Sequence, residues 1–157
     1  MIRSGGYLRS LLTAVLIGTA GCDHGLEPPP PQAAGSISGR ITYTGAWPPE
    51  SQVRDLRFVA MRFVPRDTLD FLQLTRMAIS DRLAYGVSEQ EFVIPDVEPG
   101  VFVYSGVAQQ QTSDILSWRP VGLLDGDGGL FTVEPAADTR IELIVDFDNL
   151  PVFPPPQ

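Results

Sequence analysis

The sequence predicts an all-β protein, an antiparallel β-sandwich of about seven strands that follows an export signal and a proline-rich tether. Several short segments alternate between apolar and polar residues, which is the period of a strand with one buried face. Glycines and prolines, 15 of each, lie between these segments and end them. No stretch has the apolar spacing of a convincing helix. Short strands separated by such turns are typical of sandwiches with Greek-key connections.

The first element is the stretch Leu11 to Cys22, which precedes the predicted fold and begins with an apolar run, residues 11–20. Arg3 and Arg9 come before it, and the small residues 19–21 come directly before the cysteine. Charged, apolar and small regions in this order are typical of a secretory signal peptide. The apolar run is ten residues long, whereas a helix that spans a bilayer needs about 20. We therefore expect export of the chain and no transmembrane helix.

The end of this stretch resembles the signal peptide of bacterial lipoproteins, in which a cysteine is lipidated and becomes the new N-terminus. The resemblance implies that residues 1–21 are removed and that Cys22 carries a diacylglyceryl thioether. Several acyl chains anchor a protein stably, whereas one holds it only marginally. The family prefers leucine where this chain has Thr19. The alternatives are an ordinary signal cleaved after Gly21, which leaves a soluble protein, and a retained anchor.

Composition limits the partners and the means of stabilisation. The net charge is −8. The first 21 residues hold two arginines and no acid, which leaves nine arginines against 19 acidic residues, or −10. This excess of acid argues against nucleic acid as a partner and against contact of the folded surface with anionic lipid. Cys22 is the only cysteine, so the fold has no internal disulfide and depends on packing.

Residues 22–34 form the predicted tether between the lipidated cysteine and the folded domain. Prolines 28–31 favour an extended polyproline II conformation, which holds the domain away from the membrane. His24, the only histidine, lies here. We interpret it as a solvated linker residue rather than a metal ligand or a general base.

The domain, residues 35–150, begins with two predicted strands. Ser36 to Thr44 alternates cleanly, which predicts a half-buried strand. Asp55 to Val64 is apolar on both faces, which favours a central strand with one face under a loop. Residues 66–85 then form a long excursion with a turn of helix or a short strand. Insertions of this length in small domains often carry function.

The later strands are separated by recognisable turns. Glu89 to Val97 and Val101 to Gln109 are predicted to form a hairpin, because Pro99 and Gly100 suit a type II turn. Three further strands are expected over residues 117–124, 130–133 and 139–147. A proline-rich tail, residues 151–157, follows.

Three segments, GSISGRITYTG, EFVIPDVEPGVFVYSGVA and LFTVEPAADTRIELIVDF, occur in an order that resembles a known family. This family is the carboxypeptidase regulatory-like, or prealbumin-like (transthyretin-like), β-sandwich. The matching residues are Gly35, Ile37 and Gly39 in the first motif, and Val97, Pro99, Gly100 and Phe102 in the second. Alanines 136 and 137 replace the glycine usual before the last strand. The resemblance covers roughly residues 35–148 and implies a non-catalytic accessory or adhesive module without shared catalytic residues.

The placement of reactive residues argues against an enzyme. A nucleophile with a histidine base, or a zinc site, would need the histidine or the cysteine, and both lie in the tether. A glycosidase requires two acidic residues held at a fixed separation in a cleft, whereas the acidic residues of this chain are scattered along loops. We therefore expect no catalytic residue and no cofactor.

Two acidic pairs are candidates for metal binding. Asp125 and Asp127, in a glycine-rich loop, could offer oxygens to Ca²⁺. The full EF-hand pattern is absent, so a plain turn is the favoured interpretation. Asp146 and Asp148 flank the end of the last strand, and we interpret them as solvated.

Trp47 and Trp118 could stack on sugar rings, although packing at the edge of the core is the favoured interpretation of each. The sequence thus predicts a lipid-anchored protein of the bacterial cell envelope. It would act as a non-catalytic binding or structural module for an envelope protein or a glycan. The alternatives are a carbohydrate-binding lipoprotein that uses the tryptophans and a Ca²⁺-dependent adhesion module.

Overall fold

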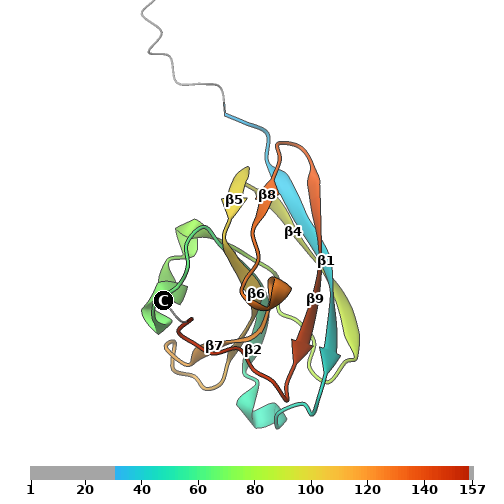
Figure 1. Ribbon diagram of the computed structural model, residues 1–157, viewed down its shortest axis with the longest axis vertical. Helices are drawn as coiled ribbons and strands as arrows, with labels where there is room; N and C mark the ends of the chain where they lie inside the picture. Colours follow the sequence, from blue (N-terminus) through green and yellow to red (C-terminus); the bar gives the residue numbers. More distant parts are fainter. Residues whose placement is uncertain (1–30, 156–157) are drawn as a thin grey trace, which may run out of the picture. The chain divides into compact units, whose positions relative to one another are not determined.

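The computed structural model describes residues 31–155, and over this range the chain is all-β (Figure 1). The predicted signal peptide, the lipidation site Cys22 and His24 lie outside the described residues and stay predictions. Over residues 31–155, no helix is long and apolar enough to cross a membrane.

Nine strands and four short 3-10 helices follow one another along the described chain. The strands are β1 (Gly35–Thr44), β2 (Asp55–Met61), β3 (Met77–Ile79), β4 (Glu89–Val97), β5 (Gly100–Phe102), β6 (Tyr104–Gln110), β7 (Trp118–Leu123), β8 (Phe131–Val133) and β9 (Asp138–Asp146). The 3-10 helices are η1 (Glu50–Gln52), η2 (Thr68–Leu72), η3 (Leu74–Arg76) and η4 (Leu124–Gly126).

The strands form a sandwich of two sheets with a small ribbon at one end. The sheets have the orders β4-β1-β9 and β3-β2-β6-β7, and the ribbon is β5-β8. Figure 1 shows β4, β1 and β9 as one layer and β2, β6 and β7 as the other. The predicted all-β sandwich is confirmed. Within the described range all ladders are antiparallel except β1 with β9, which are parallel from Ser36 opposite Asp138 to Thr44 opposite Asp146.

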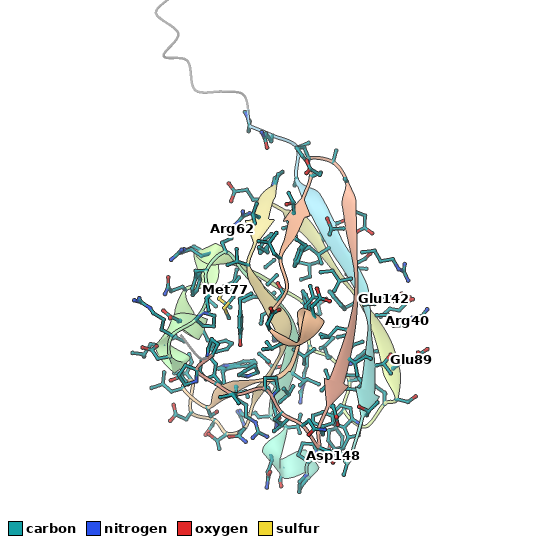
Figure 2. The ribbon with its side chains drawn as sticks, viewed as in Figure 1. Arg40, Arg62, Met77, Glu89, Glu142 and Asp148 are labelled. Carbon is teal, nitrogen blue, oxygen red and sulfur yellow. The ribbon has the colours of Figure 1, made fainter. Side chains whose placement is uncertain are left out.

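The three-stranded sheet has one buried and one solvated face, as the alternation in β1 and β9 predicts. Ile37 and Ile41 are completely buried, whereas Arg40 between them is exposed. On the outer face, Glu91 forms ion pairs with Arg40 at 3.4 Å and with Arg140 at 3.6 Å. Figure 2 shows Arg40 pointing away from the core. Such exposed pairs contribute roughly 0–1 kcal/mol each, so burial of the inner face holds this sheet in place.

The main core lies between the two sheets. Phe58 of β2 stacks on Phe92 of β4 with ring centroids 4.4 Å apart. Burial of such aromatic side chains dominates the energy of a small core. Besides Phe58, the members of this cluster with 0% exposure are Ile37, Ile41, Ala60, Val107, Val121 and Val145.

The four-stranded sheet is buried on both faces, because the excursion after β2 covers its outer side. Val59, Met61 and Tyr104 form a second apolar cluster with Phe71 of η2. The prediction of a central strand with one face under a loop is therefore confirmed for β2. The expectation for residues 66–85 was a turn of helix or a short strand. The excursion contains both, namely the 3-10 helices η2 and η3 and the short edge strand β3.

The predicted hairpin of Glu89–Val97 with Val101–Gln109 is wrong. β4 pairs with β1, and the second segment breaks at Val103 into β5 and β6. β5 pairs with β8, and β6 pairs with β2 and β7. The turn at Pro99 and Gly100 therefore carries the chain from one sheet towards the other. This break and β3 account for the nine strands in place of about seven.

Candidate functional site

An apolar hollow of about 220 Å³ lies on the outer face of the four-stranded sheet, beside Trp118. We call it the outer hollow. Strands β2, β3 and β7 form its floor, and the excursion forms one wall. Figure 2 shows Met77, at the start of β3, among the side chains on this side of the domain. Its lining residues are Arg57, Val59, Phe71, Leu72, Leu74, Met77, Ile79, Ile115 and Trp118.

Two aspartates hold the excursion in place over the sheet. Asp67 caps η2, because its carboxylate accepts from the backbone N–H of Leu69 at 2.9 Å. The carboxylate of Asp70 accepts from the N–H of Arg66 at 2.7 Å and from the amide of Gln73 at 2.6 Å. The bond from Arg66 is the main cause that lowers the pKa of Asp70 below its usual value. This network directs Phe71 into the sheet.

The rim of the outer hollow exposes large apolar side chains. Leu74, from η3, is 60% exposed, and Ile115, from the loop before β7, is 58% exposed. Leu69 and Leu72 of η2 and Leu116 of the loop before β7 are exposed as well. Contiguous apolar surface on a folded domain is typical of interaction sites.

A second hollow, of about 430 Å³, lies along the free edge of β7, and Trp118 lines it too. We call it the edge hollow. The segment after β9 forms one side, and Phe153 in that segment packs against Phe71 with ring centroids 5.5 Å apart. The described part of the predicted tail is therefore packed against the domain. The lining residues are Thr68, Gln111, Leu116, Ser117, Trp118, Arg119, Pro120, Leu150, Pro151 and Phe153.

Arg119 is the charged residue of the edge hollow. Its guanidinium donates to Gln109 Oε1 at 3.3 Å. In the amide orientation that gives both groups a partner, Gln111 Oε1 lies 3.2 Å from the guanidinium nitrogens. Partial burial lowers the pKa of Arg119, because a cation loses hydration there. No sequence pattern singles out Arg119, because its contacts with Gln109 and Gln111 depend on the tertiary fold.

Trp47, the other tryptophan proposed for stacking on sugars, packs in a separate cluster of aromatic side chains. Its ring packs 4.7 Å from Tyr43, 4.5 Å from Phe147 and 5.1 Å from Tyr85, measured between centroids. It therefore closes the end of the core, as the packing interpretation has it. The structure does not bring Trp47 and Trp118 together.

The two carboxylates proposed for Ca²⁺ belong to the loop after β7. Asp127 accepts from the N–H of Gly129 at 3.1 Å, which is a bond within the turn. Asp125 has a φ of +52°, in the left-handed region. Over residues 31–155, no three side chains of histidine, cysteine, aspartate or glutamate group closely enough to hold a metal ion.

Asp146 holds the turn that follows β9, and Asp148 ties this turn to the segment after β1. Asp146 accepts from the side chain of Asn149 at 2.8 Å and from the N–H of Asp148 at 3.0 Å, and these bonds lower its pKa. Asp148, labelled in Figure 2, accepts from the N–H of Ala46 at 3.3 Å. Both side chains are half-buried or exposed and make local contacts.

No protein-family model, no curated protein and no solved structure matches the chain. The site therefore has to be judged from its own geometry. Among the candidates, the surface around Trp118 combines two hollows, an exposed apolar rim and a cation.

Proposed function

We propose that the chain is a bacterial envelope lipoprotein, anchored through lipid on Cys22, whose β-sandwich is a non-catalytic module that binds a protein partner. The pattern from Leu11 to Cys22 supports export and lipidation. The prolines that follow support a spacer between the lipid and the domain.

The observation that carries the binding role is the exposed apolar rim around Trp118. Leu74 and Ile115 come from segments far apart in the sequence and face the same hollow. A rim of leucine and isoleucine favours a protein partner over a glycan, because sugars need many hydrogen-bond donors and acceptors.

The close packing of the motif glycines supports membership of the carboxypeptidase regulatory-like or prealbumin-like sandwiches. A Cβ on Gly35 would lie 2.6 Å from the carbonyl of Glu134, and a Cβ on Gly39 would collide with the carbonyl of Ile141. Glycine is therefore required at both motif positions by the approach of neighbouring strands. This membership implies an accessory or adhesive module.

Site-specific photocross-linking in intact cells tests the binding role. A benzophenone amino acid replaces Leu74 in one variant and Val93 in another, because both side chains are 60% exposed. Leu74 belongs to η3 and lines the outer hollow, whereas Val93 lies on β4 of the three-stranded sheet. We expect a discrete adduct from position 74 that Trp118→Ala weakens, and none from position 93. Equal adducts from both positions, or none from position 74, would contradict the proposal.

A further inference from the structure

Arg119 differs from the other arginines that line hollows in this domain. Arg57 pairs with Asp55 at 2.9 Å, Arg82 pairs with the same carboxylate at 3.9 Å, and Arg62 lies 3.8 Å from a carboxylate oxygen of Glu98. No carboxylate of residues 31–155 lies within 4.0 Å of the Arg119 guanidinium. Among the described residues, this cation is therefore held without a counter-ion.

Neutral amides hold Arg119 instead. Gln109 is completely buried, and its own amide donates to the carbonyl of Gln52 at 2.6 Å, which fixes the oxygen that faces Arg119. With Gln111, this gives two acceptor oxygens for a group with five N–H donors. The amides orient the guanidinium without neutralising it, so its charge is available to an anion that enters the edge hollow.

The apolar wall of the edge hollow lies directly beside this cation. Trp118 and Arg119 are consecutive residues of β7, whose side chains alternate between faces, and both line the hollow at the free edge of the strand. Leu150 and Phe153 extend the wall. A ligand that reaches both residues has to carry an anion and an apolar group within a few ångströms of each other.

We propose that Arg119 binds the terminal carboxylate of a protein partner whose last residue is apolar and packs against Trp118. In such a residue the carboxylate and the apolar side chain share one Cα, so the first can reach Arg119 while the second packs on Trp118. In an internal aspartate or glutamate, the side chain itself carries the charge, and no apolar group is left to pack on Trp118. Planar, bidentate contact with a carboxylate is what a guanidinium does best. This inference rests on the proposed function and names the part of the partner that the module recognises.

Binding of matched peptides to the purified full chain tests the inference. The probes are an acetylated tetrapeptide that ends in leucine with a free carboxylate and the same peptide with a C-terminal amide. Their dissociation constants come from NMR titration of the Trp118 indole and Arg119 Nε–H signals. We expect the acid to bind about tenfold more tightly than the amide, since a charge-assisted pair is lost in the amide. In Arg119→Gln the two peptides should bind alike, and Arg119→Lys should keep part of the difference.

Arg82→Gln is the matched control, because it removes an arginine that lines another hollow and should leave the tenfold preference intact. Octanoate and glucuronate, which carry a carboxylate on a fatty chain or a sugar, should bind more weakly than the peptide acid. The inference is overturned if acid and amide bind equally, if neither binds, or if octanoate or glucuronate binds as tightly. If position 74 cross-links to a partner but acid and amide bind equally, the proposed function is supported and this inference is wrong. If the acid binds preferentially but position 74 gives no cross-link, carboxylate binding by Arg119 is supported and the proposed function is wrong.

Discussion

The guanidinium of Arg62 lies over the ring of Phe102, with its central carbon 4.6 Å from the ring centroid. The same group donates to the carbonyl of Glu98 at 2.6 Å, in the turn that leads from β4 to β5. Arg62→Met keeps much of the aliphatic contact and removes both interactions. We expect a loss of about 1–2 kcal/mol in the free energy of unfolding, because the side chain is only 26% exposed. Urea denaturation measures this loss.

Arg40→Met is the control for that substitution. It removes an arginine from an exposed ion pair with Glu91, so the loss should be below about 1 kcal/mol. Equal losses in the two variants would show that the contact of Arg62 with Phe102 and the turn adds nothing specific.

Ala136 has a φ of +56°, in the region that favours glycine, and stands where the resembled family usually has glycine. The left-handed conformation costs an alanine about 1–2 kcal/mol, and glycine at this position would remove that strain. Glycine also makes the unfolded chain more flexible, which lowers the stability of the folded state by about 0.4–1 kcal/mol. Ala136→Gly should therefore stabilise the protein by about 0.5–1 kcal/mol in thermal or urea unfolding. Ala137→Gly, at a position outside the left-handed region, should destabilise it. Destabilisation by both variants would contradict the assignment of strain to Ala136.

The carboxylate of Asp70 should make the excursion sensitive to acid. Its hydrogen bonds lower its pKa in the folded state below 3.8. The stability that it contributes is therefore present above about pH 4 and is lost as the pH falls through the lower folded pKa. Asp70→Asn should be less stable than the wild type at pH 7, and the difference should shrink as the pH falls from about 4 towards 2. Hydrogen exchange of residues 66–73 measures this, and a difference that stays constant with pH would refute it.

Local patterns predicted most of the strands but not all of their partners. The alternation in β1 and β9 is visible in the sequence, yet their parallel pairing joins segments about 100 residues apart, which no local signal reports. The hairpin prediction failed for a related reason. Phe102 and Tyr104 have the spacing of one face of one strand, but they lie in different apolar clusters, because the chain turns at Val103.

The candidate site was only partly predictable. Trp118 stood out as an aromatic residue at a strand start, and residues 66–85 stood out as a long insertion. The hollows arise where that insertion, the loop before β7 and the segment after β9 meet. The contacts of Arg119 with Gln109 and Gln111 depend on the tertiary fold, so sequence spacing does not predict them.

Metabolic labelling with palmitate tests whether lipid on Cys22 anchors the chain to a membrane. The wild-type chain should incorporate label and fractionate with membranes, whereas Cys22→Ala should incorporate none and keep its signal peptide. A matched substitution next to the site, Thr19→Leu, should label at least as well as the wild type. Equal label in the wild type and Cys22→Ala, or an unlabelled mature wild type released into the medium, would show that Cys22 does not carry a lipid anchor.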